Sequence, residues 1–221
     1  MFLEIWFKMD EDIAIINQNT RVSLVRKFFK KNSKKILSLI IVFITILLIF
    51  FAFDEFKQRK KENFAETYNT LIFNTDKFSN QEIKNKMIQI INGKVDTYST
   101  LALYYLIDNN FIKDQDKIAE LFDTVISINK DAELKNLVIF KKGLYFSDKL
   151  QENELLEILK PIINSESIWK QHALFLMGDL YFNKKQLNKS KEFFQKVTQL
   201  DNVNNKLRVE AEKRLNRDFS E

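Results

Sequence analysis

Residues 171–204 read QHALFLMGDLYFNKKQLNKSKEFFQKVTQLDNVN, a stretch of 34 residues in which two amphipathic patterns are joined by a short polar turn. Large apolar side chains recur at helical spacing in both halves, as expected for two helices that pack against each other. Gly178 lies in the middle of the first half, where a glycine costs about 1 kcal/mol relative to alanine and therefore needs a packing reason. We predict a helical hairpin whose packing residues are Leu174, Met177, Gly178, Tyr181, Ser190, Phe194 and Val197.

This unit resembles a tetratricopeptide repeat, in which a small residue lies where the two helices approach most closely. Two weaker copies align with it, and their small positions would be Ala102 and Lys141, which gives intervals of 39 and 37 residues up to Gly178. Lys141 is not a small residue, and the turns in both copies are longer than the standard repeat allows. A plain helical bundle is therefore the alternative to a repeat array.

The rest of the C-terminal region has the same character, with amphipathic segments of about 12 to 18 residues separated by polar turns. It contains a single proline, Pro161, and no convincing stretch with the alternating pattern of a strand. We expect helices near residues 54–73, 80–92, 95–109, 115–128, 131–147, 152–164, 167–183, 187–200 and 203–217.

An uncharged apolar run, ILSLIIVFITILLIFFAF, occupies residues 36–53. As a helix it would be roughly 27 Å long, close to the hydrocarbon thickness of about 30 Å. A buried core helix is the alternative, but such helices seldom lack charge for so long. A cleavable signal peptide would place a shorter apolar region nearer the start of the chain. We therefore predict a retained transmembrane helix.

Basic residues near this run predict its orientation. Seven Arg and Lys residues lie within 15 residues before it and four within 15 residues after it, which favours a cytoplasmic N-terminus. The predicted domains are a cytoplasmic tail with a basic juxtamembrane helix (1–35), the transmembrane helix (36–53) and a helical repeat domain (54–221). The predicted fold class is all-α, with one transmembrane helix followed by a tetratricopeptide-like array of helical hairpins in a right-handed α-solenoid.

The composition offers little for catalysis or for nucleic acid. Residues 1–35 carry 8 basic and 4 acidic side chains, whereas residues 54–221 carry 27 and 26, so the large domain has no surface of one sign by count. There is no cysteine, and the single histidine, His172, lacks a second obvious ligand. We expect no catalytic residue, metal, cofactor, small-molecule substrate or nucleic-acid partner. Enzymatic use of Glu152, Glu154 and Glu157 is a weak alternative, since solvated helices have the same spacing.

The order of segments resembles the membrane-anchored tetratricopeptide-like family of Gram-negative bacteria that includes the ancillary subunit of the Sec translocon. The segments that carry the resemblance are DED (10–12), RKFFKK (26–31), FAETYNTL (64–71), SIWKQHALFLMGDLYF (167–182) and KLRVEAEKRL (206–215). The resemblance implies a single-pass inner-membrane protein with a periplasmic repeat domain. It also implies as partners the Sec translocon, periplasmic chaperones and secreted or envelope clients. A structural scaffold for cytochrome maturation or cell division is the alternative.

A stack of helical hairpins curves, and its concave side presents residues of the first helix of each hairpin that lie outside the core. Counted from Gly178 and from Lys141, the predicted groove residues are His172, Phe175, Asp179, Phe182, Asn183, Lys135, Val138, Lys142, Tyr145 and Phe146. Exposed aromatic rings beside polar groups are typical of an adaptable binding surface. The alternative is that the rings of Phe175, Phe182 and Tyr145 only seal the next hairpin.

Overall fold

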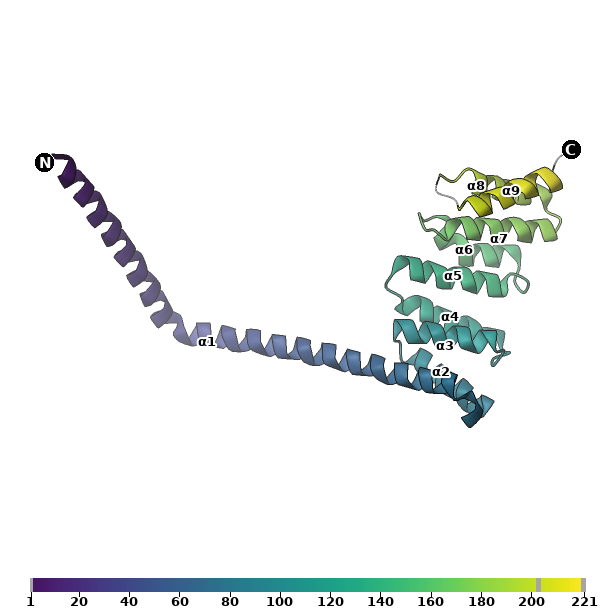
Figure 1. Ribbon diagram of the computed structural model, residues 1–221, viewed down its shortest axis with the longest axis horizontal. Helices are drawn as coiled ribbons and strands as arrows, with labels where there is room; N and C mark the ends of the chain where they lie inside the picture. Colours follow the sequence, from purple (N-terminus) through teal and green to yellow (C-terminus); the bar gives the residue numbers. More distant parts are fainter. Residues whose placement is uncertain (1, 202–203, 220–221) are drawn as a thin grey trace. The chain divides into compact units, whose positions relative to one another are not determined.

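The computed structural model describes residues 2–201 and 204–219, without the side chains of residues 2–19, 21 and 218. Over these residues the chain is helical throughout, which confirms the predicted all-α fold (Figure 1). The helices are α1 (Phe2–Phe73), a short 3-10 helix η1 (Thr75–Lys77), α2 (Asn80–Asn92), α3 (Asp96–Asp108), α4 (Gln115–Ile128), α5 (Ala132–Phe146), α6 (Glu152–Ile163), α7 (Lys170–Asn183), α8 (Leu187–Thr198) and α9 (Asn205–Asp218).

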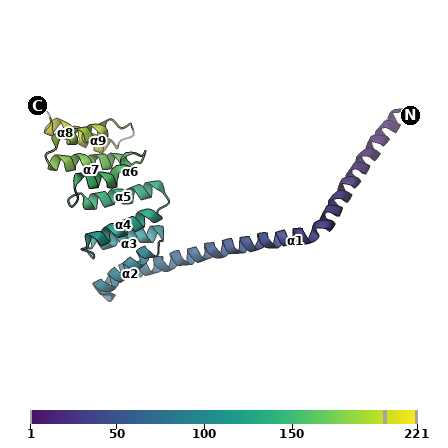
Figure 2. The same ribbon diagram turned by 180° about the vertical axis from the view of Figure 1, so that it is seen from behind.

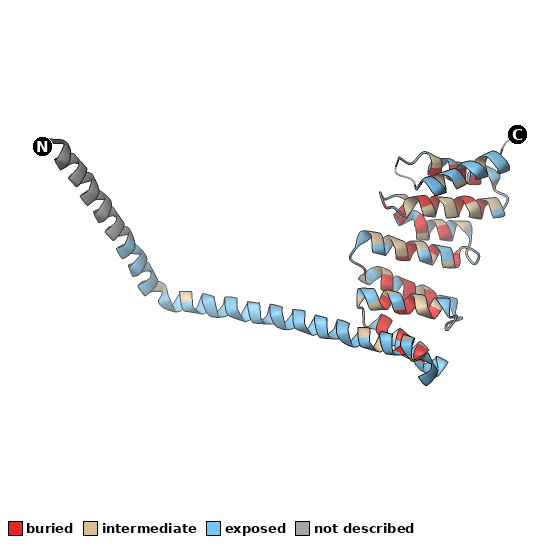
Figure 3. Cartoon of the chain, in the orientation of Figure 1, coloured by how far each residue is buried: buried red, intermediate tan, exposed pale blue. Residues whose placement is uncertain are grey.

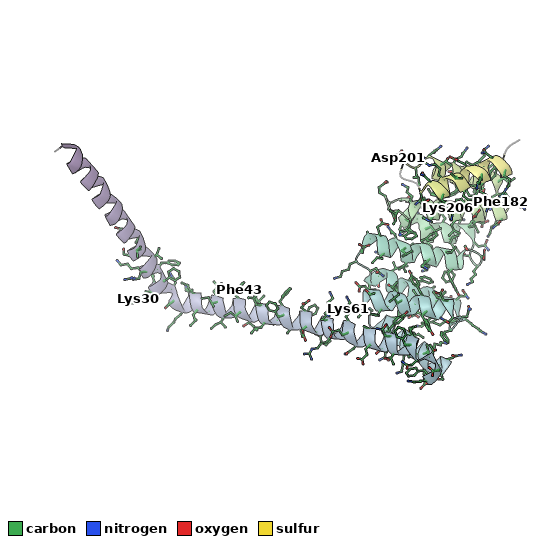
Figure 4. The ribbon with its side chains drawn as sticks, in the orientation of Figure 1. Lys30, Phe43, Lys61, Phe182, Asp201 and Lys206 are labelled. Atoms are coloured by element: carbon green, nitrogen blue, oxygen red, sulfur yellow. The ribbon has the colours of Figure 1, made fainter. Side chains whose placement is uncertain are left out.

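The chain comprises two compact units, residues 1–59 and 60–221. The first unit consists of α1 alone, and every residue from 37 to 53 is exposed. Figure 4 labels Phe43 within this apolar run. Thr45 keeps its hydroxyl satisfied inside the helix by donating to the Ile41 carbonyl at 2.9 Å. Among the described residues, α1 is the one helix long and apolar enough to cross a membrane by length and composition.

The second unit begins with the last turns of α1 and continues as a stack of successive antiparallel helices, α2 to α9 (Figures 1 and 2). Leu71 near the end of α1 is buried, and the ring of Phe64 lies so close to Gly93 that a Cβ there would overlap it. The helical repeat array predicted from residues 171–204 is therefore present, and the end of α1 supplies its first core residues.

Polar residues before several helices explain where those helices begin. The Ser79 hydroxyl accepts a hydrogen bond from the Glu82 amide, while the Glu82 carboxylate accepts one from the Ser79 amide, which completes a capping box at α2. The carboxylates of Asp114 and Asp131 accept from amides in the first turns of α4 and α5. These caps satisfy donors that the first turn of a helix leaves unpaired.

Two clusters of buried side chains form the core of the second unit, as the buried residues in Figure 3 show. The first extends from α1 to α5 and is centred on residues such as Met87, Leu103 and Phe122. The second extends from α5 to α9 and is centred on residues such as Leu159 and Phe194. Helix α5 contributes to both clusters.

Candidate functional site

The hairpin of α7 and α8 is held together where Gly178 meets Phe194. A Cβ at Gly178 would lie 2.8 Å from Cε1 of the Phe194 ring, so this close approach requires glycine. Next to this contact, the hydroxyl of Ser190 donates a hydrogen bond of 2.8 Å to the Gly178 carbonyl, and both residues are buried. The remaining sequence-derived packing residues are also buried: Leu174, Met177, Tyr181, Phe194 and Val197.

On the other side of α7, His172 belongs to a cluster of three rings. The ring centroids of Trp169 and His172 are 5.3 Å apart, and Phe140 of α5 lies 5.8 Å from Trp169 and 5.7 Å from His172. The Nδ1 atom of His172 is buried and has no hydrogen-bond partner among the described residues. This places His172 in an apolar seam between the α5–α6 hairpin and α7. Side chains from three or more His, Asp or Glu residues do not gather into a metal-holding group anywhere in the described part of the chain.

Helix α9 lies against the face of α7 that was predicted to line a groove. A pocket of about 330 Å³ separates the two helices and is lined by His172, Phe175, Asn204, Lys206, Leu207 and Glu210. Figure 4 labels Lys206 and Phe182 in this part of the stack. The chain itself thus covers this part of the predicted groove and leaves only a small opening.

Further along α7, direct contacts with α9 replace the pocket. Asp179 pairs with Arg214 at 3.0 Å, and the guanidinium carbon of Arg214 lies 5.9 Å from the centroid of the Phe182 ring. The ring of Phe182 also meets Phe219 in an edge-on arrangement at 6.1 Å. Asn183, the last predicted residue on this face, is exposed. Phe182 therefore helps to seal the array against its final helix.

The groove register predicted for α5 was wrong by two residues. The closest approach between α5 and α6 is at Gly143, where a Cβ would lie 2.6 Å from Cδ2 of Leu159, whereas Lys141 is exposed. A long charged side chain cannot occupy the contact, and the glycine two residues later can. Two residues predicted to line the groove are therefore core residues: Val138 is fully buried and Phe146 is 5 % exposed.

The other predicted α5 residues face the neighbouring helix α4 or the end of their own helix. Lys142 pairs with Asp123 of α4 at 2.6 Å, with 13 % of its side chain exposed. Tyr145 packs beside Phe122 of α4 at 6.1 Å, and the ammonium of Lys149 lies 3.4 Å from the centroid of the Tyr145 ring. Lys135 is exposed near the start of α5. These contacts do not bring the α5 and α7 sets together into one groove.

With Gly143 as the reference, a different surface emerges across α3 and α5, which we call the α3–α5 face. The ammonium of Lys141 lies 4.4 Å from the centroid of the Tyr104 ring, so these two positions are neighbours across the helices. Leu101 lies one helical turn from Tyr104 on α3 and is 39 % exposed, and Leu144 lies one turn from Lys141 on α5 and is 52 % exposed. Helix α9 packs mainly against α8 and α7.

Tyr104 is half-buried at the centre of the α3–α5 face. Its hydroxyl has no hydrogen-bond partner among the described residues, and burial raises the pKa of Tyr104 to about 12. Tyr104 was not among the residues predicted from the sequence. The signal that could have identified this face was Gly143, the only glycine of α5.

The glutamates considered for catalysis each have a structural partner. Glu152 accepts a hydrogen bond from the Gln186 side chain at 2.7 Å and pairs with Lys184 at 3.4 Å. Hydrogen bonding from its own backbone amide is the main cause that lowers the pKa of Glu152, and Lys184 lowers it further. Glu154 caps the start of α6, and Glu157 pairs with Lys160. Their geometry is that of a solvated, ion-paired helix.

Comparison with known proteins places most of the chain in one family model. Residues 26–214, which are 189 of the 221 residues, match the model described as a tetratricopeptide repeat-like domain. Neither the curated proteins nor the solved structures include a match. The match begins within α1, covers α2 to α8 and ends within α9.

Proposed function

Because the chain belongs to the tetratricopeptide repeat-like domain family, we propose that it is a membrane-anchored, non-enzymatic protein that works by binding other proteins. Repeat arrays of this kind present extended surfaces to partners and owe their role to binding. The observation that carries the proposal is the α3–α5 face, where two exposed leucines flank the pair formed by Tyr104 and Lys141. Tyrosine is among the residues enriched at protein-binding hot spots, and exposed apolar side chains beside it add surface that a partner can bury.

The anchor in this proposal is residues 36–53. Their complete lack of charge and their exposure in the structure support a lipid environment, since water would have to solvate an apolar surface of this length. The proposed domain organisation is a cytoplasmic tail (1–35), the transmembrane helix (36–53) and an interaction domain (54–221). The excess of basic residues before the span supports a cytoplasmic N-terminus.

The proposed location is the inner membrane, with the repeat domain in the periplasm. The proposed partners are the Sec translocon, periplasmic chaperones, and secreted or envelope client proteins. Support comes from the order of segments that resembles the family of the ancillary Sec subunit. Tethering to the membrane would raise the local concentration of the domain at the channel exit, so weak contacts with emerging chains would suffice.

A crosslinking experiment on intact membranes tests the binding role and the partners together. A photoreactive residue is placed at Leu144 on the α3–α5 face or, as a control of similar exposure, at Leu187 on α8, which is 45 % exposed. We expect adducts at position 144 that contain Sec subunits, chaperones or envelope proteins, and few adducts at position 187. Equal amounts of adduct at both positions would argue against the α3–α5 face as the binding surface. A partner set dominated by one cytochrome-maturation or cell-division machine would favour a scaffold role instead.

A second experiment tests the topology independently. A reporter that is active only outside the cytoplasm is fused after Glu221. Activity is expected if the repeat domain is periplasmic, and an inactive reporter on a stably produced fusion would refute the proposed location without affecting the fold.

A further inference from the structure

The part of α1 that precedes the apolar run has two chemically distinct faces. At about 100° per residue, Val22, Val25, Phe28 and Phe29 fall within about 120° of the helix circumference. The basic residues between positions 22 and 31 occupy about 140° on the opposite side, and they are Arg26, Lys27, Lys30 and Lys31. Figure 4 labels Lys30 on this part of the helix. The segregation is that of an amphipathic helix.

The apolar face has no cover within the described part of the chain. The exposed fractions of its side chains are 55 % for Val22, 55 % for Val25, 60 % for Phe28 and 54 % for Phe29. Two adjacent phenylalanines in water are unfavourable, because each ring loses the free energy that burial of its apolar surface would provide. This face therefore calls for an apolar environment outside the chain.

Among the described residues, the basic face likewise has no acidic partner. The sequence has no Asp or Glu between Asp12 and Asp54. Asp12 precedes Arg26 by 14 residues, which corresponds to roughly 21 Å along a helix and is more than twice the screening length of about 8 Å at physiological salt. Residues 26–35 form no ion pair with any other described residue. Within the described part of the chain these charges have no partner, which leaves them available to an external anion.

Two polar side chains between this segment and the apolar run bond to the backbone of their own helix. The Asn32 amide donates to the Phe28 carbonyl at 3.1 Å, and the Ser33 hydroxyl donates to the Lys30 carbonyl at 3.3 Å. Side chains that compete in this way for helical carbonyls favour bending of a helix. Residues 32–33 thus provide a position where the helix can change direction between the basic segment and the span.

We propose that residues 22–31 lie in the plane of the membrane surface and bind anionic phospholipid headgroups. Phe28 and Phe29 insert at the boundary of headgroups and acyl chains, while the basic face contacts the phosphates. A large separation of apolar and basic faces is the property that holds helices in this interface, and basic residues next to a span are attracted to an anionic leaflet. The inference rests on the proposed anchor, which places this segment beside a bilayer.

The test uses single cysteines in the full-length chain, which contains no native cysteine. An environment-sensitive probe is attached to Val25→Cys on the apolar face, to Ser23→Cys on the basic side, or to Thr45→Cys in the span. Each protein is placed in bilayer discs of phosphatidylcholine, with or without phosphatidylglycerol, that contain lipids brominated on their tails. We expect strong quenching at position 25 only in the anionic discs, weak quenching at position 23, and strong quenching at position 45 in both.

Charge variants separate binding to headgroups from simple proximity to the bilayer. Changing Arg26, Lys27, Lys30 and Lys31 to glutamine should abolish the effect of phosphatidylglycerol on the probe at position 25. The matched control changes the four basic residues after the span, Lys57, Arg59, Lys60 and Lys61, to glutamine and should leave the effect intact.

Three outcomes would overturn the inference, and one of them also tests the anchor. Equal quenching at positions 23 and 25, with position 45 quenched, refutes the interfacial orientation but leaves the anchor in place. If added RNA abolishes the quenching of the probe at position 25, the basic face binds nucleic acid in preference to lipid. An unquenched probe at position 45 refutes the anchor itself.

Discussion

Replacing Gly178 with alanine tests whether the closest contact of the α7–α8 hairpin is sterically full. The added Cβ would lie 2.8, 2.9 and 3.1 Å from three atoms of the Phe194 ring, all closer than ordinary van der Waals contact. The ring has little room to retreat, because Phe194 is completely buried and Phe175 lies 5.2 Å away on one side. The backbones of α7 and α8 must therefore move apart.

Two opposing terms determine the size of the effect. Alanine gains about 1 kcal/mol of helix propensity over glycine, whereas an additional group in a filled core costs about 1–3 kcal/mol. The separation of the helices would also lengthen the hydrogen bond from Ser190 to the Gly178 carbonyl. We expect a net loss of about 1 kcal/mol, which corresponds to a decrease in Tm of about 2–4 °C for a domain of this size.

The measurement is thermal unfolding of the full-length chain in detergent, in a Trp6→Phe background so that the fluorescence reports on Trp169, which stacks on Phe140 in the same region. Gly143→Ala is a companion variant, because its Cβ would lie 2.6 Å from Cδ2 and 3.1 Å from Cγ of Leu159, which is also completely buried, and it should lose stability to a similar extent. The double variant Gly178→Ala/Phe194→Leu should lose less than the sum of the two single variants. A rise in Tm for Gly178→Ala, or strict additivity in the double variant, would refute the steric argument.

Three further predictions concern polar groups of the repeat domain. Ser190→Ala should destabilise the domain by about 1 kcal/mol, because the buried hydrogen bond from its hydroxyl to the Gly178 carbonyl is lost. Urea unfolding measures this change, and an unchanged midpoint would contradict it. Hydrogen bonding from the Ser79 backbone lowers the pKa of Glu82. The ionised carboxylate therefore stabilises α2 at pH values above the ordinary pKa of glutamate, and this stabilisation is lost as the pH falls through the lowered pKa. Glu82→Gln should flatten the acid limb of a plot of Tm against pH, and an unaltered limb would count against the capping box. Tyr104→Phe should leave stability unchanged or raise it by up to about 1 kcal/mol, because the hydroxyl is buried without a partner among the described residues. In an absorbance titration, the variant should lack the tyrosine whose pKa is raised to about 12. A clear loss of stability would reveal a hydrogen bond to this hydroxyl.

Most of the fold could be predicted from the sequence because its determinants are local. Apolar spacing, polar caps and the scarcity of proline placed the helices of the repeat domain within three residues of their observed ends. The largest difference is at the start of α7, expected at residue 167 and observed at Lys170. There the Ser167 hydroxyl accepts from the Trp169 amide and donates to Glu133 of α5, so a turn precedes the helix.

The candidate site was harder to predict because it depends on register between helices that are distant in sequence. On α7 the glycine at the contact was recognised, and the face follows from it. On α5 the groove residues were counted from Lys141, whereas the close helix contact is at Gly143. This error of two residues assigned core residues such as Phe146 to the predicted groove. The role of α9 was not foreseen, because its polar sequence gives little indication that Arg214 would pair with Asp179.

Helix α5 has a consequence for how the repeat domain unfolds. Val138 and Phe146 insert into one core cluster, and Ile139 inserts into the other, so a single helix is a structural member of both halves. Opening either half must disturb the helix that the other half requires, and repeat arrays gain cooperativity from such nearest-neighbour coupling. Amide hydrogens in α3 and α7 should therefore exchange with similar opening free energies, and a chain cut before α5 should not leave two independently stable fragments.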